Sequence, residues 1–250
     1  MGASVTAAVR TWFVTGSSAG LGRALVTESL ARGETVAATA RDPGALLDLR
    51  SPSGKPPWTA RLDITDADRI RRVVDDAAGA LGRIDVAVSN AGYGLFGAAE
   101  EATGEQVERQ IRTNLTGPIH LARALLPHLR AQCHGRIIQI SSVGGQCTAP
   151  GMAVYHATKW GVEGFFESLA AEVKGFGIGV TIVEPGAVRT YFTGRSKEMT
   201  AALPAYRGTP ATVIRRTVES RSARCPGDLA KMAAAYGARP GVSSCRSRWT

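Results

Sequence analysis

A short apolar strand, a glycine-rich turn and a helix follow one another near the start of the chain, and this succession restricts the fold most. Residues 11–15 (TWFVT) are β-rich and apolar, TGSSAGLG occupies 15–22, and 21–32 has helical spacing before Gly33. Such a turn lets the backbone approach a pyrophosphate, whose charge the helix amino terminus favours. It predicts a dinucleotide site, with a tight ligand-free connection as the alternative. The candidate contacts are Gly16, Ser17, Ser18, Gly20, Leu21 and Gly22.

Strand and helix signals alternate along most of the chain. This alternation predicts an α/β fold in which a doubly wound, Rossmann-like parallel sheet lies between two helical layers. The later strands are expected at 35–40, 59–62, 84–89, 136–141 and 179–183. The helices are expected at about 42–50, 66–81, 105–131 with a kink at Pro118, 153–174, and a lid at 209–224.

Length and charge suit one domain, with a core at about 11–194 and a lid and basic tail at 195–250. The net charge of +9 is concentrated in that tail, which holds eleven Lys and Arg and only three Asp and Glu. Residues 1–194 hold nineteen Lys and Arg and eighteen Asp and Glu. We therefore expect no nucleic-acid partner, although a binder using the basic tail is an alternative. No run is long enough to span a membrane, and the first ten residues do not suit a secretory signal.

The four cysteines show no CxxC pair and no metal-ligand spacing, so we expect free thiols, no metal site and a cytoplasmic location.

Tyr155 and Lys159 are four residues apart in the segment expected to be a helix, and Ser142 stands thirteen residues before Tyr155. On a helix, residues at this spacing share a face, with Cβ atoms about 5–6 Å apart. A neighbouring ammonium favours the phenolate and lowers the tyrosine pKa from about 10. The pattern predicts a phenol that exchanges a proton with an alcohol or carbonyl oxygen. By itself, it also suits ordinary helix-surface residues.

Three strand ends predict further cofactor contacts. At the end of the second strand an acid suits the ribose of NAD, whereas an arginine suits a 2′-phosphate. Arg41 stands there, so we expect NADP(H) in preference to NAD(H); Asp42 beside it weakens the distinction, and a solvated arginine is the alternative. Asp63 and Ile64 suit an adenine ring, or a capped loop; Asn90 suits the ligand edge of the sheet, or a plain turn.

Taken together, these motifs resemble those of the short-chain dehydrogenase/reductase family, over about residues 11–194. The matching segments, in order, are TGSSAGLG at 15–22, SNAG at 89–92, Asn114 in TNLTG, SSVGG at 141–145, YHATK at 155–159 and EPGAVRT at 184–190. The resemblance implies a three-layer Rossmann fold and a homodimer or homotetramer, with helices 105–131 and 153–174 as contacts.

The resemblance also implies roles for individual residues. Tyr155 would be the acid/base, Ser142 would orient the substrate oxygen, and Lys159 would lower the pKa of Tyr155 and hold the nicotinamide ribose. Asn114 would bend its helix and anchor a water molecule for proton relay. The remaining cofactor contacts would be Asn90, Ala91 and Gly92, then Pro185 and Gly186 lining the nicotinamide pocket, with Val188 and Thr190 bonding its carboxamide.

The sequence departs from this pattern at its end. The family usually finishes with a strand beside the sixth, but residues 236–250 (YGARPGVSSCRSRWT) show neither alternation nor an apolar run. We expect this last strand to be missing, as in a truncated or frame-altered chain.

The substrate is expected to be a small apolar carbonyl or alcohol. Tyr93, Phe96 and Tyr191 are candidate contacts, although they suit core or lid packing as well, and 145–152 and 191–221 are the expected walls. The lid arginines 215, 216, 221 and 224 are expected to form a solvated face, or a docking surface for an acidic carrier or substrate. A ketoreductase-type reaction is predicted, with a catalytically silent dinucleotide sensor as the alternative.

Overall fold

The computed structural model describes residues 9–186, 196–220, 229–238 and 247–249. Strands and helices alternate along these residues, as the sequence predicts. The strands are β1 (Thr11–Thr15), β2 (Thr35–Ala40), β3 (Trp58–Arg61), β4 (Val86–Ser89), β5 (Gly94–Phe96), β6 (Gly135–Ile140), β7 (Ile178–Pro185), β8 (Lys197–Met199) and β9 (Ser247–Trp249). The α-helices are α1 (Gly20–Ala31), α2 (Ala67–Leu81), α3 (Gly104–Ile111), α4 (Gly117–Gln132), α5 (Ala153–Val173), α6 (Pro210–Ser220) and α7 (Leu229–Ala238).

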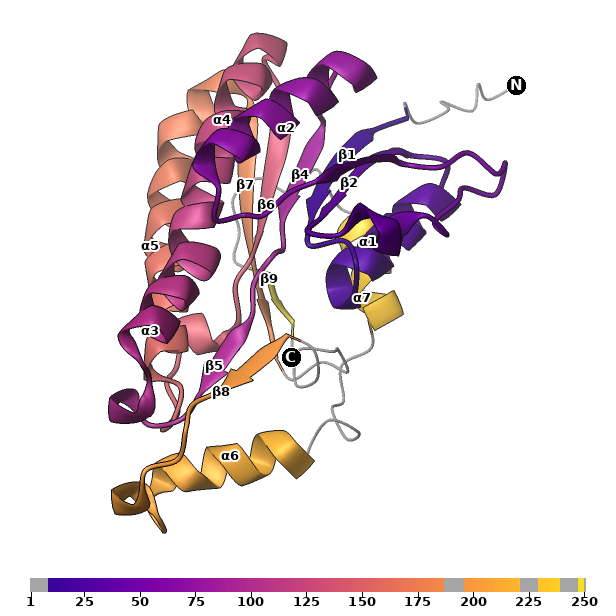
Figure 1. The fold of residues 1–250 in the computed structure, drawn as a ribbon. Helices are drawn as coiled ribbons and strands as arrows, with labels where there is room; N and C mark the ends of the chain where they lie inside the picture. Colours follow the sequence, from indigo (N-terminus) through magenta and orange to yellow (C-terminus); the bar gives the residue numbers. More distant parts are fainter. Residues whose placement is uncertain (1–8, 187–195, 221–228, 239–246, 250) are drawn as a thin grey trace, which may run out of the picture.

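A parallel sheet forms the centre, with its strands in the order β3-β2-β1-β4-β6-β7-β9 (Figure 1). Each neighbouring pair in this sheet is parallel. The chain moves outward from β1 in one direction and from β4 in the other, so the strand order reverses between these two. The predicted doubly wound fold is confirmed, and a reversal of this kind is where such sheets bind ligands.

Helices cover both faces of the sheet (Figure 1). The helices α2, α4 and α5 pack on one face over a core that includes Phe13, Ala87 and Phe166. On the other face α1 and α7 cover a second core that includes Trp12 and Val14. Burial on both faces explains why the strands are continuously apolar rather than alternating.

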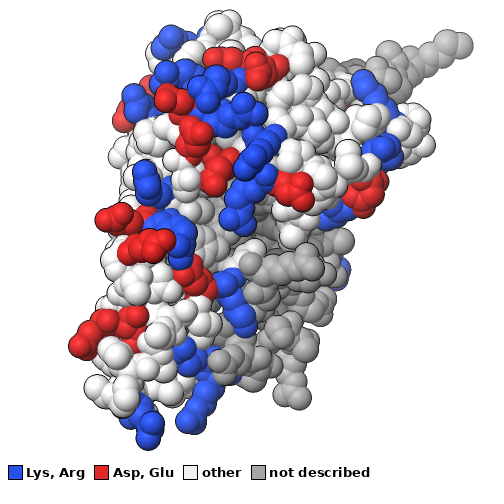
Figure 2. Space-filling model, in the orientation of Figure 1, with Lys and Arg blue, Asp and Glu red and all other residues white. Residues whose placement is uncertain are grey.

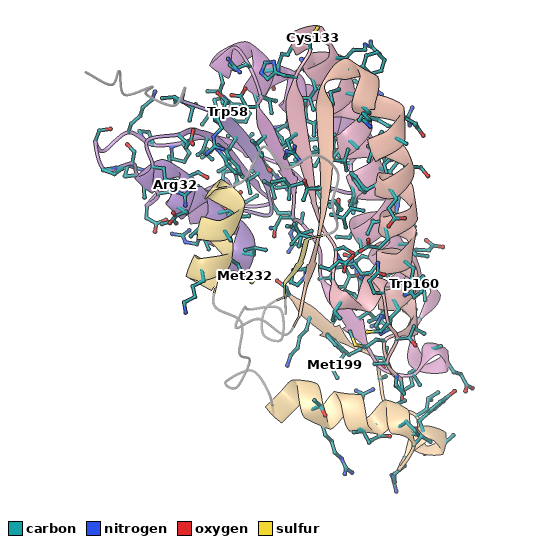
Figure 3. The ribbon with its side chains drawn as sticks, turned by 180° about the vertical axis from the view of Figure 1, so that it is seen from behind. Arg32, Trp58, Cys133, Trp160, Met199 and Met232 are labelled. Carbon is teal, nitrogen blue, oxygen red and sulfur yellow. The ribbon has the colours of Figure 1, made fainter. Side chains whose placement is uncertain are left out.

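The two helices that cover the second core, α1 and α7, are joined by a hydrogen bond. Arg32, just after α1, donates a hydrogen bond of 3.0 Å to the Ala234 carbonyl of α7, and Met232 of α7 packs against the core (Figure 3).

The helix expected at 105–131 bends at Asn114, as the family resemblance implies, and not at Pro118. A π-helical turn at Arg112–Thr116 separates α3 from α4. Pro118 lies in the first turn of α4, where a missing N–H removes no intrahelical bond. The bend therefore belongs to the π turn that contains Asn114.

The expectation of a missing last strand is wrong. Residues Ser247–Trp249 form β9, whose partners in β7 are Val183, Glu184 and Pro185. Two other strands, β5 and β8, pair in parallel outside the main sheet. Each of these three strands has only three residues, too few for a periodic pattern. The helix expected at about 42–50 is shorter, a 3₁₀ turn at Pro43–Leu46.

Acidic and basic side chains are intermixed over the face that Figure 2 shows. This mixture agrees with the near balance of charge before residue 195. Among the described residues, no helix combines the length and apolar character that crossing a membrane requires.

A buried carboxylate joins the amino-terminal ends of three strands. Asp85, just before β4, accepts hydrogen bonds from the Thr11 amide at 2.8 Å, from Arg83 Nε at 2.9 Å and from His134 Nε2 at 3.0 Å. Burial alone would raise the pKa of Asp85, but these donors outweigh it and hold the pKa below its ordinary value.

We expect Asp85→Asn to lower the free energy of unfolding by roughly 2 kcal/mol, because an amide leaves some of these buried donors unpaired. A depressed carboxyl pKa stabilises the fold fully above the unfolded-state value and loses its effect as pH falls through the folded-state value. The free energies of unfolding of the wild type and of Asp85→Asn should therefore become equal in acid. Urea unfolding from pH 7 to pH 3 measures this, with the exposed Asp75→Asn as control. Equal stabilities at pH 7 would contradict it.

Candidate active site

The glycine-rich turn after β1 is braced by the end of β4. The Thr15 hydroxyl accepts hydrogen bonds from the amides of Asn90 at 3.0 Å and Ala91 at 3.1 Å. The Asn90 side-chain amide donates to the Thr15 carbonyl at 2.9 Å and to the Gly16 carbonyl at 3.3 Å. Asn90 therefore braces the glycine turn from the neighbouring strand, and its contact with a cofactor stays a prediction.

The turn has no room for side chains at two of its glycines. Gly16 has a φ of 68°, and a Cβ at Gly22 would lie 2.4 Å from the Gly16 carbonyl oxygen. Helix α1 then begins at Gly20 with no side-chain cap from Ala19. Ser17 is buried and donates to the Val14 carbonyl at 2.9 Å, whereas Ser18 is exposed. The predicted residues Gly16 to Gly22 are thus gathered in one tight turn at the carboxyl edge of the sheet.

Arg41 follows β2 at this edge and is exposed. The carboxylate of Asp42 accepts a hydrogen bond of 2.9 Å from the Gly44 amide, so it caps the following 3₁₀ turn.

Asp63 and Ile64 have structural uses at the end of β3. Asp63 Oδ1 accepts from the amide and the hydroxyl of Thr65, at 2.9 and 2.8 Å, which is the loop-capping alternative. Ile64 is buried in the core. Contact of either residue with adenine stays a prediction.

Asn114 lies in the π turn and is buried. Its side chain accepts from the Tyr93 amide at 3.1 Å and donates to the Tyr93 carbonyl at 2.8 Å. Gln110 also donates to that carbonyl, at 2.8 Å. Asn114 therefore fixes the segment after β4, with Gly92 close to its side chain: a Cβ at Gly92 would lie 3.1 Å from Asn114 Oδ1.

Tyr155, Ser142 and Lys159 come together at the carboxyl end of β6. Tyr155, in the first turn of α5, is only 4% exposed and hydrogen-bonds to Ser142. Lys159 lies one turn further on, 7% exposed, with its Nζ 5.7 Å from the centre of the Tyr155 ring. The neighbouring Ser141 is buried on the other side, next to Gly145, so Ser142 is the serine that meets Tyr155.

The pKa of Tyr155 departs from the sequence expectation. Burial raises it to about 12, against the opposing hydrogen bond with Ser142. The Nζ of Lys159 lies 5.7 Å from the centre of the Tyr155 ring and donates a hydrogen bond of 3.0 Å to the Ile140 carbonyl. Burial also lowers the pKa of Lys159 to about 8, while the nearby Glu163 raises it. Burial thus shifts both pKa values toward the neutral forms, but Lys159, with a pKa of about 8, still carries its charge at pH 7.

His156 was not singled out by the sequence analysis, although it stands inside the YHATK segment. It is 7% exposed, and both of its ring nitrogens contact the loop that follows Ser142. Its only sequence signal is its place beside Tyr155.

The structure describes only part of the predicted substrate site. Phe96 is buried in β5, and the half-buried Tyr93 has its pKa raised by burial, against the opposing effect of Arg109. Tyr191, Val188 and Thr190 lie outside the described residues, while Pro185 ends β7 and Gly186 is exposed beyond it. A groove of about 370 Å³ lies instead between the loop after Ser142 and α6. It is lined by Ala149, Pro150, Gly208, Pro210, Val213 and Thr217.

Arg215 of the lid helix α6 is not part of a solvated face, in contrast to the sequence expectation. It pairs with Glu101 at 2.9 Å and donates to the Thr200 carbonyl at 2.9 Å, just after β8, which ends at Met199 (Figure 3). The Leu203 amide donates to Glu101 as well, at 3.0 Å. Arg216 is exposed as expected, and Arg221 and Arg224 lie outside the described residues.

Comparison with known proteins decides the family. The sequence profile of short chain dehydrogenases matches residues 10–201. The chain belongs to this family. Two curated short-chain dehydrogenase relatives are Oxidoreductase BOA17 of Botryotinia fuckeliana, 41% identical over 199 residues, and the 3-ketodihydrosphingosine reductase of Bacteroides thetaiotaomicron, 38% identical over 180 residues. These matches cover 79% and 72% of this chain, and 73% and 64% of the two relatives.

Solved structures of short-chain dehydrogenases agree with this assignment. One from Streptomyces avermitilis is 41% identical, with a TM-score of 0.83 over 91% of this chain and 83% of that one. The match with a metagenomic short-chain oxidoreductase in complex with NADP (33% identical, TM-score 0.68) spans 72% of this chain and 84% of that one. The match with the 3-ketoacyl-(acyl-carrier-protein) reductase of Brucella melitensis, complexed with NADH (26% identical, TM-score 0.69), spans 73% of this chain and 77% of that one. Structural relatives of this short-chain dehydrogenase thus bind either nicotinamide cofactor.

We expect Glu101→Gln to loosen the lid of this dehydrogenase. Burial opposes ionisation of Glu101, but the amides of Leu203 and Ala98, the Thr200 hydroxyl and the charge of Arg215 lower its pKa to about 2. The contribution of this depressed group is complete above the ordinary glutamate pKa and is lost as pH falls toward 2. Trypsin should cleave the 196–220 segment several-fold faster in the variant at pH 7. The exposed Glu105→Gln serves as control. Equal cleavage rates for the wild type and both variants would show that Glu101 does not hold the lid.

Proposed function

We propose that the chain is one oxidoreductase domain that uses NADP(H) to interconvert a carbonyl and a secondary alcohol of an apolar small molecule. One observation carries this proposal. The Tyr155 phenol, hydrogen-bonded to Ser142 and with Lys159 one helical turn on, stands at the sheet edge that also holds the glycine turn. This is the arrangement that a proton exchange with a bound oxygen requires.

The residues present fit a dinucleotide. The glycine turn is tight enough that a Cβ at Gly22 would meet backbone, and α1 starts there without a side-chain cap, so the turn offers backbone amides to a pyrophosphate. Arg41 is exposed where a 2′-phosphate would lie, and Asp42 is engaged by the Gly44 amide. These features support NADP(H) over NAD(H). When bound, the nicotinamide supplies or accepts the hydride.

The protein supplies the proton and the electrostatics. With a pKa of about 12, the Tyr155 phenol is protonated at neutral pH and suits donation to a carbonyl oxygen, the direction of reduction. Ser142 holds the same oxygen by a hydrogen bond. Lys159, with a pKa of about 8, is mostly charged at pH 7 and favours the phenolate left after donation. Asn114 holds the Tyr93 segment beside this site.

An apolar substrate suits the groove beside this site. Its lining is mostly apolar, and one wall, Ala149 and Pro150, belongs to the loop that starts at Ser142. The relative named a 3-ketodihydrosphingosine reductase acts, by its name, on a lipid ketone, which supports the same class.

We also propose a homodimer or homotetramer in the cytoplasm. Trp160 of α5 is 53% exposed on the outer helical layer, which suits a contact with a second copy through α4 and α5 (Figure 3). Cys133 and Cys147 are free and exposed, as a reducing compartment allows.

We expect Tyr155→Phe to reduce turnover at least a thousandfold while the Kd for NADPH changes little, because the variant loses only the transferable proton. Oxidation of NADPH is followed with a panel of apolar ketones, and cofactor binding is followed by fluorescence. A variant that kept wild-type turnover would rule out the mechanism. Binding of NADPH by the wild type without turnover on any ketone or alcohol would favour the catalytically silent alternative.

We expect Arg41→Ala to raise the KM for NADPH about ten- to a hundredfold, the effect of losing one charge-assisted hydrogen bond, and to leave the KM for NADH unchanged. Initial rates with both cofactors measure the ratio. The exposed Arg72→Ala on α2 is the matched control and should alter neither KM. An equal change for both cofactors would argue against recognition of a 2′-phosphate.

A further inference from the structure

His156 bridges the two halves of the loop that begins at Ser142. Its Nδ1 lies 2.8 Å from the Gly144 carbonyl oxygen, and its Nε2 lies 3.0 Å from the Ala149 amide nitrogen. A backbone N–H can only donate, so Nε2 accepts and carries no proton. A carbonyl can only accept, so Nδ1 carries the proton and donates. These two partners together fix one neutral tautomer of the ring.

The ring is also fixed in position by close packing. A Cβ at Gly144 would lie 2.9 Å from His156 Nδ1 and 3.2 Å from Tyr155 Cε1, so the bare glycine lies against both rings. The Tyr155 and His156 rings meet edge to face, with centroids 5.8 Å apart. The imidazole therefore cannot move without disturbing either Tyr155 or the loop.

The two ends of the loop serve different parts of the site. Near its start, the Ser142 hydroxyl accepts from the Gly144 amide at 3.0 Å, so the position of Gly144 sets the direction of Ser142. Turn hydrogen bonds from Gly145, Gln146 and Cys147 back to residues 142 and 143 add to the contact of His156 with Gly144 in this half. Near its end, Ala149 and Pro150 line the groove, and the bond to His156 ties this half to α5.

We propose that His156 is a positioning residue, which, as its Nδ1–H tautomer, holds the loop so that Ser142 faces Tyr155 and the segment Ala149–Pro150 walls the substrate groove. This role rests on the proposed reaction for its effect on turnover. The hold on the loop itself can be measured without any substrate.

The first experiment replaces the ring. His156→Ala removes both bonds and should lower kcat/KM about ten- to a hundredfold, because small displacements of an orienting group are costly. His156→Asn has an amide that can still donate to Gly144 but is too short for Ala149. It should recover kcat while the KM stays raised, more for a bulky apolar ketone than for a small one. The Kd for NADPH should stay within about twofold in both.

The second experiment observes the loop directly by NMR. In the wild type the nitrogen shifts of His156 should report a protonated Nδ1 and an unprotonated Nε2. The Ala149 amide should be protected from hydrogen exchange and should lose at least tenfold of that protection in His156→Ala and in His156→Asn. The control is His128→Asn, which removes a surface contact with Asp75 and should leave Ala149 exchange and kinetics unchanged.

The outcomes separate the two proposals. An Nε2-protonated ring, or unchanged Ala149 exchange in His156→Ala, would overturn the role of His156 whatever the enzyme reduces. If the variants altered hydrogen exchange at Ala149 but changed neither kcat nor KM, His156 would be a structural residue without a role in positioning the site. If the wild type reduces no carbonyl, the proposed function fails, whereas the tautomer and exchange measurements still decide whether His156 holds the loop.

Discussion

The hydrogen bonds between Thr15 and the start of the segment after β4 are the contact on which the site depends. One hydroxyl accepts from two successive amides and donates to the Val88 carbonyl, while Asn90 returns a bond to the glycine turn. Because β1 and β4 are parallel neighbours on either side of the reversal in strand order, this contact closes the sheet edge where a ligand enters. The contact joins the glycine turn to the segment after β4, where Tyr93 in turn hydrogen-bonds to Asn114 of the π turn.

Sequence reasoning succeeded where local patterns suffice. The strands, the glycine turn and the helical spacing of Tyr155 and Lys159 are local, and the structure reproduces them. It failed where a residue's use depends on a distant partner. Arg215 hydrogen-bonds to Glu101, which lies 114 residues earlier, and β9 pairs with the distant strand β7. His156 is similar: nothing in five residues of sequence shows that its two nitrogens face backbone groups of a preceding loop.

The electrostatic balance on α5 was a further limit. Sequence spacing places an ammonium beside a phenol and suggests that charge dominates. In the folded chain both side chains are more than nine-tenths buried, and desolvation is the largest influence on each of their pKa values. Tyr155 therefore keeps its proton at neutral pH, and in the proposed reaction it would act as the acid of a reduction.

The short strand β9 leaves the border of the sheet only partly protected. Its pairing covers Val183 to Pro185 of β7, so that among the described residues the stretch from Ile178 to Ile182 has a strand partner on the β6 side alone. Unpaired backbone groups along a β-strand are a template for another chain. Among the described residues, the border along β7 is therefore open to strand-to-strand aggregation, as is the outer side of β3 at the other end of the sheet, and β9 shortens the open part of β7.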